Sequence, residues 1–250
     1  MNKLSDRLQL IANKINEGET MADIGTDHGF LPIYMAETGR SPFAIMGDVS
    51  EPSLEKGKRN ARMMVKDLKT LEKMDFRVGD GLKVLNSGEV DAVVIAGMGG
   101  KLIRDIMAAD IGHTCSFKKF ILQPRIGQGH LRKWLVNNEF KIISEDVVIE
   151  GDYIPEVITA ISPGHDVSDK AVNTKISTEA GGDDMIWKIP PWMAEAGGPV
   201  GEFFERFIGL EEEKLDNVRK AKTRNLDFEE SISKDIEYLR TLRKEWESGF

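Results

Sequence analysis

Acidic residues at the ends of two predicted strands form the first candidate binding site. Asp23 lies in the strand-like stretch 20–24, and Gly25 after it can adopt backbone angles that are closed to other residues. Pro32 suits the first turn of a following helix, and strand, glycine turn and helix together open a doubly wound sheet. Asp48 ends the next apolar run, where a carboxylate can accept hydrogen bonds from both hydroxyls of a ribose. The pattern therefore predicts a site for an adenosyl ligand.

The turn after the first strand distinguishes between two classes of adenosyl ligand. Dinucleotide-binding folds use Gly-x-Gly-x-x-Gly so that a pyrophosphate can sit on a helix amino terminus, whereas this turn reads Gly-Thr-Asp-His-Gly-Phe. Asp27 would repel a phosphate, which disfavours a nicotinamide dinucleotide. Asp23 and Asp27 instead suit a cationic ligand, such as the amino group and sulfonium of S-adenosylmethionine. Asp27 or His28 alone could be a helix cap, but capping does not account for Asp48.

Two glycine motifs follow later predicted strands. In Gly-Asp80-Gly81 the carboxylate could accept from an adenine amino group while Gly81 leaves room for the ring, although an ordinary turn would use the same residues. The stretch 95–100, Ile-Ala-Gly-Met-Gly-Gly, ends the fourth strand at the edge where ligands bind in open sheets. There Gly97 and Met98 would expose backbone groups beside a methyl donor. The alternative is that these glycines only allow the next helix to pack closely.

Length and composition are typical of an α/β enzyme with an appendage. The chain has 250 residues, 40% of them hydrophobic, and its single cysteine, Cys115, excludes an internal disulfide. No metal-ligand spacing, membrane span or signal peptide is visible, so we expect no metal, no membrane partner and a cytoplasmic location. The net charge of −8 argues against a chain coated in nucleic acid but does not exclude a local basic face.

Apolar patterning predicts a parallel sheet followed by a hairpin and a helical tail. We expect strands near 20–24, 43–48, 74–78, 91–96 and 118–123, with helices near 32–39, 51–67, 99–109 and 127–138, after a first helix capped by Ser5. The runs 140–150 and 154–161 favour an antiparallel hairpin at the sheet edge. By analogy of fold, this arrangement resembles that of a Rossmann-like class I methyltransferase.

The last third of the chain differs in character. Residues 162–199 contain paired glycines and prolines without apolar periodicity, so we expect an irregular connection between a domain 1–161 and a domain 200–250. Trp187 and Trp192 in the connection would either pack against the domain or stack on a substrate base. One apolar stripe in each of two charged segments then predicts a helical hairpin or short antiparallel coiled coil.

Five motifs occur in a characteristic order: Asp-Ile-Gly-Thr-Asp-His, Gly-Asp-Gly, Ile-Ala-Gly-Met-Gly-Gly, Ile-Leu-Gln-Pro and Leu-Arg-Lys-Trp-Leu. With the charged tail they resemble the bacterial tRNA adenine N1-methyltransferases that modify nucleotide 22, over about residues 3–161 by motif and 200–250 by pattern. The resemblance implies a tRNA substrate, held partly by the coiled-coil tail. It also implies S-adenosylmethionine contacts at Asp23, Gly25, Asp27, His28, Asp48, Asp80, Gly81, Gly97 and Met98.

The expected chemistry requires alignment more than proton transfer. Adenine N1 has an available lone pair at neutral pH, so its attack on a sulfonium methyl needs no general base. Gly97-Met98 occupies the place where enzymes that methylate exocyclic amines commonly carry Asn/Asp-Pro-Pro-aromatic, which disfavours amino-group methylation. Carbonyls around Gly97 and the Gln123 amide could stabilise developing charge. We predict that Gln123 and Pro124 position the adenine; a strand end without function is the alternative.

Basic residues around the fifth strand are the candidate RNA contacts. Arg125, Arg132 and Lys133 should lie on the side of the sheet that carries Gly97, and we expect the two arginines to contact phosphate. The sequence also permits a methyltransferase with a small-molecule or protein substrate, or a non-catalytic adenosyl-binding interaction protein. Whether the chain is a monomer or a weak homodimer stays open.

Overall fold

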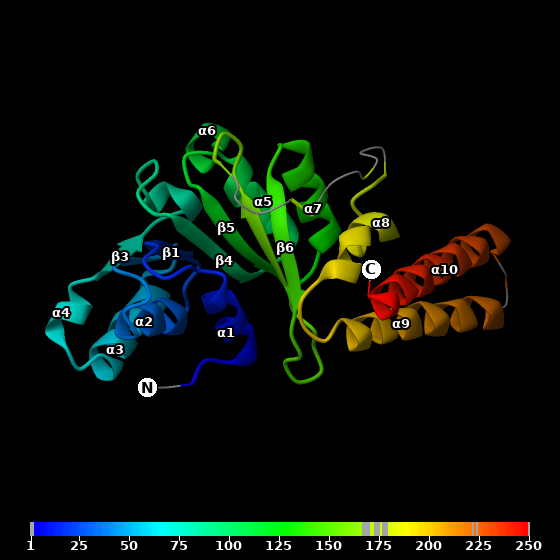
Figure 1. The fold of residues 1–250 in the computed structure, drawn as a ribbon, viewed down its shortest axis with the longest axis horizontal. Coiled ribbons are helices and arrows are strands. Elements are labelled where there is room, and N and C mark those ends of the chain that lie inside the picture. The colour runs from blue at the N-terminus through cyan, green and yellow to red at the C-terminus, as the bar shows by residue number, and fades with distance from the viewer. Residues whose placement is uncertain are drawn as a thin grey trace.

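The sheet has the topology that the sequence predicts. The structure is a computed structural model that describes residues 3–166, 171–172, 176, 180–221, 223 and 225–249. Within them, one sheet has the order β3-β2-β1-β4-β5-β7-β6 (Figure 1). The strands are β1 (Met21–Ile24), β2 (Ala44–Asp48), β3 (Met74–Val78), β4 (Ala92–Met98), β5 (Lys119–Pro124), β6 (Lys141–Val147) and β7 (Glu156–Ile161). β1 to β5 run parallel, whereas β7 is antiparallel to β5 and to β6, which confirms the predicted hairpin at the sheet edge.

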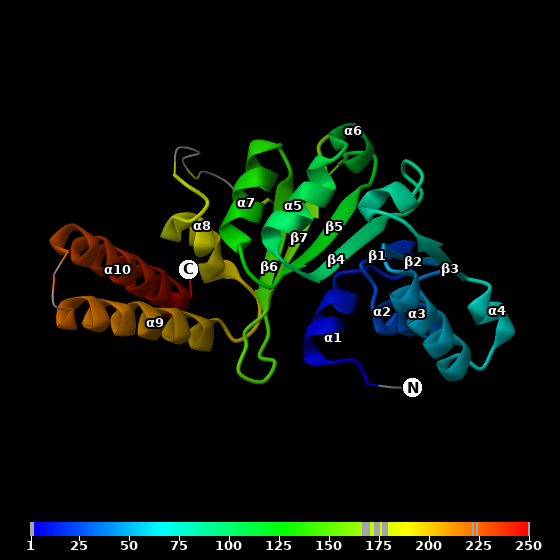
Figure 2. The ribbon, with the colours of Figure 1, turned by 180° about the vertical axis from the view of Figure 1, so that it is seen from behind.

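Helices cover both faces of the sheet, as a Rossmann-like fold requires. They are α1 (Asp6–Asn13), α2 (Phe30–Glu37), α3 (Glu51–Met64), α4 (Leu68–Leu71), α5 (Gly100–Ala108), α6 (Ile111–Thr114), α7 (Gln128–Asn137), α8 (Met185–Lys188), α9 (Val200–Lys220) and α10 (Leu226–Ser248). The first three lie on one face, and α5 and α7 lie on the other (Figure 2). Two single turns of 3₁₀ helix, η1 (Gly81–Val84) and η2 (Pro191–Glu195), complete the described elements.

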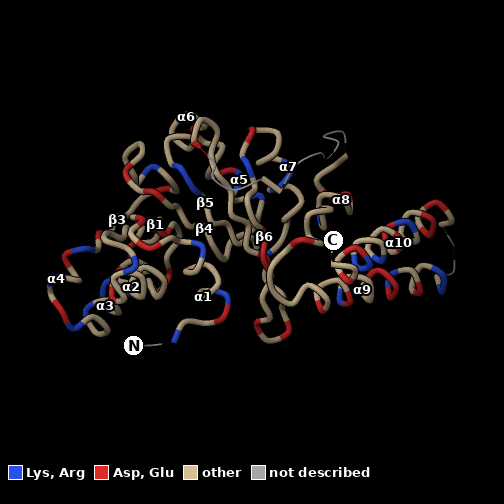
Figure 3. The backbone as a smooth tube through the Cα atoms, in the orientation of Figure 1, with Lys and Arg blue, Asp and Glu red and all other residues tan. Residues whose placement is uncertain are grey.

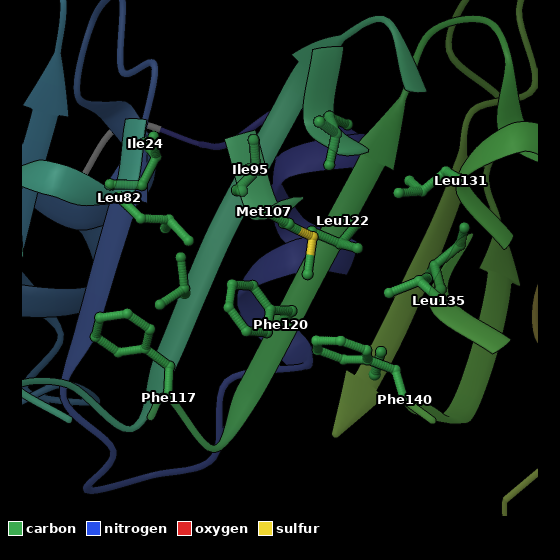
Figure 4. Packing of buried hydrophobic residues seen from close by; sticks show 14 of the residues in the cluster. Ile24, Leu82, Ile95, Met107, Phe117, Phe120, Leu122, Leu131, Leu135 and Phe140 are labelled. Carbon is green, nitrogen blue, oxygen red and sulfur yellow. The ribbon is translucent and has the colours of Figure 1, made fainter. Parts of the chain in front are cut away.

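The core explains why the sheet holds its position between the helices. Phe120 and Leu122 of β5 are fully buried and lie beside Met107 of α5, with Leu131 and Leu135 of α7 next along the sheet (Figure 4). Burial of each such side chain stabilises the fold by about 1.5–3 kcal/mol. On the opposite face, a second cluster joins α1 and α2 to β1, β4 and β5.

The strand order fixes where a ligand can bind. β1 lies between β2 and β4, and the chain leaves β1 toward one face of the sheet and β4 toward the other. The two connections therefore diverge and leave a crevice at the carboxyl ends of β1 and β4, which is the usual binding position in open parallel sheets. The turn after β1 and the stretch 95–100 both lie at this edge.

The connection after β7 contains more structure than its sequence suggests. Its described part forms α8 and η2, in which Trp187 is fully buried and Trp192 is 5% exposed. Of the two roles considered for these tryptophans, packing is therefore the one confirmed. Residues 167–170, 173–175 and 177–179 of this connection lie outside the described residues.

The two C-terminal helices form the predicted hairpin. α9 and α10 pack along each other, and Asn225 caps α10 by accepting a hydrogen bond from the Phe228 amide at 3.0 Å. Acidic and basic residues are interspersed along both helices (Figure 3), and some pair across them, as Arg240 does with Glu212 at 2.6 Å. The described surface of the hairpin is thus of mixed charge rather than uniformly basic.

Candidate active site

A cavity of about 770 Å³ opens at the carboxyl ends of β1 and β4. Its volume is in the usual range for small-molecule and cofactor sites, about 300–1,000 Å³. Side chains from α1 and α2 form the outer wall, and the cavity takes in six predicted cofactor residues: Asp23, Gly25, Asp27, His28, Gly97 and Met98. We call this space the first cavity.

Asp23 is the carboxylate placed deepest in the first cavity. Burial raises the pKa of its carboxyl to about 6, and the nearby Asp48 adds to the rise, while Thr26 and Arg7 favour the charged form. The Thr26 hydroxyl is buried and approaches this carboxyl without reaching full hydrogen-bond geometry. Asp23 therefore titrates close to neutral pH, where a cationic ligand group would favour its ionised form.

Glycines let the backbone approach the middle of the first cavity. Gly25 has a φ of 81°, and a Cβ atom there would lie 2.0 Å from the Met98 methyl carbon, so Met98 packs directly onto the Gly25 backbone. Gly97 has a φ of 77° and interrupts the pairing of β4 with β5. A Cβ atom on Gly100 would lie 2.4 Å from the Gly127 carbonyl oxygen. Gly97 thus shapes the site, whereas Gly100 serves close packing.

The Gln123 side chain joins three elements at the floor of the site. Its Oε1 atom accepts from the Gly97 amide at 3.1 Å and from Arg7 Nη1 at 3.2 Å, and its Nε2 atom donates to the Pro124 carbonyl at 3.1 Å. Arg7 also donates to Glu150 at 3.1 Å. Because these contacts occupy the amide, Gln123 holds the Gly97 turn in place, and the prediction that it positions the adenine stays untested.

Asp27 and His28 lie at the rim of the first cavity. Asp27 pairs with His28 at 3.2 Å and with Lys56 at 3.3 Å, and all three side chains are about half exposed. The N-cap of α2 is Gly29, without any side-chain capping bond. The alternative in which Asp27 or His28 caps this helix is therefore wrong, and both side chains can turn toward a ligand.

The three other predicted cofactor residues lie outside the first cavity, at neighbouring strand ends. Asp48 ends β2 and accepts from the Ser50 amide at 2.7 Å through one of its two carboxylate oxygens. Asp80 follows β3, is 69% exposed and pairs with Lys83 at 2.6 Å, and Gly81 begins η1 with a φ of 56°. The order β3-β2-β1 places all of these residues along one edge of the sheet.

A second cavity adjoins the first beyond the end of β5. It includes Gln123, Pro124 and Arg125, and it shares Arg7, Arg125 and Glu150 with the first cavity. The Arg125 guanidinium is exposed and passes 3.8 Å from the position of a Cβ on Gly97. Of the predicted RNA contacts, Arg125 is therefore the one that lies between the two cavities.

Comparison with known proteins identifies the family. Residues 4–158 match the family model described as a methyltransferase domain. A Bacillus subtilis (strain 168) protein named tRNA (adenine(22)-N(1))-methyltransferase is 37% identical over 166 residues, which are 66% of this chain and 68% of that protein. The chain belongs to this methyltransferase family.

Solved structures of related methyltransferases share the whole fold. The m1A22 tRNA methyltransferase TrmK from B. subtilis superposes with a TM-score of 0.71 at 28% identity, over 98% of both chains. A Streptococcus pneumoniae protein crystallised with S-adenosyl-L-methionine superposes with a TM-score of 0.74, over 96% of this chain and 100% of that chain. At 24% identity the second likeness shows the fold alone.

Arg132 does not contact RNA phosphate in this methyltransferase, and that prediction is wrong. Its guanidinium is fully buried and forms ion pairs with Glu145 of β6 and Glu156 of β7. It also donates to the backbone oxygens of Trp187 at 3.1 Å and Lys188 at 2.6 Å, while the Trp192 indole donates to Glu145 at 2.7 Å. Arg132 therefore ties α7 and the hairpin to α8 and η2.

Lys133 is also directed away from the site. Its ammonium group donates to the Ala180 carbonyl in the connection, and the side chain lines neither cavity. Among the described residues, no helix could cross a membrane and no cluster of His, Cys, Asp and Glu could hold a metal ion.

Several residues of the site were not predicted from the sequence. Arg7, Glu150 and Arg206 line the cavities from α1, from the hairpin tip and from α9. Each comes close to the end of β5 only through the tertiary fold, so no local motif marks them. Ser5, which caps α1, allows the helix to be predicted from the sequence, but it does not predict that Arg7 of this helix points into the site.

Replacing Arg132 should lower the free energy of unfolding of the protein rather than weaken RNA binding selectively. Arg132→Ala leaves two buried carboxylates without their cation, so we expect a loss of about 3–5 kcal/mol in the free energy of unfolding. Arg125→Ala is the matched control, because the exposed Arg125 has no ion-pair partner among the described residues, and its change should stay within about 0.5 kcal/mol. Urea denaturation of both variants measures this; equal stability of the two would contradict the assignment.

Proposed function

We propose that this chain transfers the methyl group of S-adenosylmethionine to N1 of adenine 22 in tRNA, the activity for which its B. subtilis relative is named. The observation that carries the proposal is the first cavity, in which the half-buried Asp23 and three positive-φ glycines, Gly25, Gly29 and Gly97, lie where parallel sheets bind ligands. Within its lining, Asp23 and Asp27 suit a cationic amino acid moiety and disfavour a pyrophosphate.

The residues of this chain fit the cofactor. Asp23 and Asp27 would bind the amino group, and the space that Gly25 leaves by having no Cβ is filled by the Met98 methyl group, which lines the site beside it. Asp48 would hold the ribose hydroxyls. The full set proposed to contact the cofactor is Asp23, Gly25, Asp27, His28, Asp48, Asp80, Gly81, Gly97 and Met98.

The reaction needs little from the protein beyond alignment. Bound S-adenosylmethionine supplies an electrophilic methyl group on a positively charged sulfur. The adenine N1 lone pair forms the new N–C bond as the S–C bond breaks, and the electrons of that bond remain on sulfur. Holding the two reactants in line can contribute several orders of magnitude in rate. Gly97 and Met98 would border the reacting atoms, and the Glu150 carboxylate lies close enough to both cavities to stabilise the cationic ring that results.

The proposal extends to the RNA and to the organisation of the chain. Arg125 and Arg206 are exposed cations beside the second cavity and suit contacts with phosphate. Residues 1–161 would form the methyltransferase domain, 162–199 the connection and 200–250 a helical hairpin that helps to hold tRNA. A tRNA substrate also implies a cytoplasmic location.

The direct test uses two unmodified tRNA transcripts, one with adenine and one with guanine at nucleotide 22. With labelled S-adenosylmethionine, we expect methyl transfer only to the adenine transcript and 1-methyladenosine in its nuclease digest. Guanine N1 carries a proton and lacks the free lone pair that the reaction uses. Equal labelling of both transcripts would move the target to another nucleotide, and binding of cofactor without any transfer would contradict a tRNA substrate.

Cofactor affinity should depend on pH through Asp23. Its pKa of about 6 in the free protein means that it is largely protonated at pH 5, so binding of a cationic ligand should weaken about tenfold between pH 7 and pH 5. Asp23→Asn should bind more weakly at pH 7 and lose this dependence. Calorimetric titration with S-adenosylhomocysteine measures both effects, and Asp105→Asn, on the exposed surface of α5, is the control.

The stability of the same variant shows whether weaker binding comes from a lost contact or from a destabilised fold. Because the folded-state pKa of Asp23 lies above its unfolded value of 3.8, ionisation destabilises the fold progressively between pH 3.8 and about 6 and fully above that range. Asp23→Asn should therefore raise the free energy of unfolding by about 1 kcal/mol at pH 8, after allowance for partial exposure, and hardly at pH 4. A pH-dependent affinity that persists in Asp23→Asn would contradict the assignment.

A further inference from the structure

The second cavity is the largest described space outside the first one that also borders the reaction site. It has a volume of about 570 Å³ and is walled by the end of β5, the start of α7, the tip of the β6–β7 hairpin, the first turns of α9 and Arg7 of α1. The hairpin tip lies between α1 and α9 in both views (Figures 1 and 2). Because Arg7, Arg125 and Glu150 line both cavities, a group in the second cavity would face the first directly.

The outer wall of this cavity offers aromatic and apolar surface, much of it exposed. Tyr153 is 74% exposed at the hairpin tip, and Ile126 is 72% exposed after β5. Phe207 of α9 is half-buried, with its ring 4.7 Å from that of Phe203. Splayed-out RNA bases stack on exposed aromatic rings of this kind, and such stacking needs no particular base sequence.

The inner wall carries the side chain of Gln128, the first residue of α7. Gln128 lies beside the carboxyl of Glu156, whose pKa burial raises to about 7 while Arg132 and Gln128 counteract the rise. An amide that donates one N–H to a carboxylate keeps a second N–H and its carbonyl oxygen. Among the described residues no donor to the Gln128 oxygen is found, whereas the Gln123 oxygen accepts from both Gly97 and Arg7.

We propose that the second cavity receives the target adenine, with the ring stacked on Tyr153 and its N6 and N7 atoms read by the Gln128 amide. This inference rests on the proposed function. A glutamine amide matches adenine at these atoms, since its oxygen accepts from the N6 amino group and its N–H donates to N7. This contact uses the Hoogsteen edge, so N1 on the other edge is left free to face the methyl group in the first cavity.

The same geometry gives a reason for selectivity. Guanine presents an oxygen where adenine presents the N6 amino group, so the Gln128 oxygen would face a second acceptor. If the amide turned to serve that oxygen, its N–H groups would move away from the Glu156 carboxyl. Gln128 is thus assigned as the specificity-determining residue and Tyr153 as the stacking residue, and neither lines the first cavity.

The assignment of Gln128 is tested with a transcript that carries 7-deazaadenine at nucleotide 22, in which carbon replaces N7. The wild-type chain should methylate it with kcat/KM about tenfold below that of the adenine transcript, because one hydrogen bond is lost. Gln128→Ala should be slower on adenine and show no further penalty on 7-deazaadenine. Gln9→Ala, which changes a glutamine of α1 that bonds Asn13, should keep the wild-type penalty.

The assignment of Tyr153 is tested by Tyr153→Ala and Tyr153→Phe. The alanine variant should raise KM for tRNA about tenfold or more, and the phenylalanine variant should restore it, since the ring and not the hydroxyl stacks. Both variants change an exposed loop residue, so this pair stands even if Gln128→Ala fails to fold. Binding of S-adenosylhomocysteine should be unchanged in all four variants.

The outcomes distinguish failure of the base pocket from failure of the proposed function. Normal methylation by the wild-type chain, with an undiminished 7-deaza penalty in Gln128→Ala and unchanged KM in Tyr153→Ala, would overturn the base pocket and leave the proposed function intact. No transfer by the wild-type chain to the adenine transcript would overturn the proposed function and the pocket with it.

Discussion

The buried Arg132 guanidinium is the interaction on which the substrate side of this methyltransferase depends. It is enclosed by Glu145 and Glu156 from two antiparallel strands and by backbone oxygens of α8, with the Trp192 indole bound to the same carboxylate. A buried ion pair adds little net stability compared with an apolar core, but removal of one partner is costly. Its effect is to fix the connection after β7 against the sheet, and with it the place where α9 begins.

This anchoring determines how the two cavities meet. The first cavity needs only the parallel half of the sheet and helices α1 and α2, whereas the second needs the hairpin tip and α9 in position beside β5. The Gln123 amide performs a similar role on a smaller scale, because it links the Gly97 turn to Arg7. For a reaction that proceeds by alignment, such fixed supports matter more than an acid or a base.

Much of the cofactor side could be predicted from the sequence, because its signals are local. Strands end at Asp23 and Asp48 or just beyond them, glycines mark turns with positive φ, and apolar alternation marks the hairpin. Element boundaries were less accurate: α2 spans Phe30–Glu37 rather than 32–39. α8 and η2 were not predicted, since such short helices are stabilised by burial of Trp187 and Trp192 and not by their own periodicity.

The substrate side could not be predicted because its contacts are long-range. Arg132 belongs to the Leu-Arg-Lys-Trp-Leu motif and was predicted to contact phosphate, yet its partners are carboxylates on β6 and β7 and carbonyls of α8. In the sequence, Gln123 stood out because it lies at a strand end. The structure shows that the Gln128 amide oxygen is the one without a donor among the described residues. This difference between the two glutamines depends on the side chains around each of them.

The most direct test of the account is a methyl-transfer assay on an otherwise unmodified tRNA transcript with 1-deazaadenine at nucleotide 22, in which carbon replaces N1. We expect no incorporation of labelled methyl into this transcript, because the nucleophilic lone pair is gone. Binding of the transcript should stay unchanged within about twofold, because the Hoogsteen edge that Gln128 reads is intact. Methylation of the deaza transcript at that nucleotide would show that the methyl group goes to another atom and would contradict attack by N1.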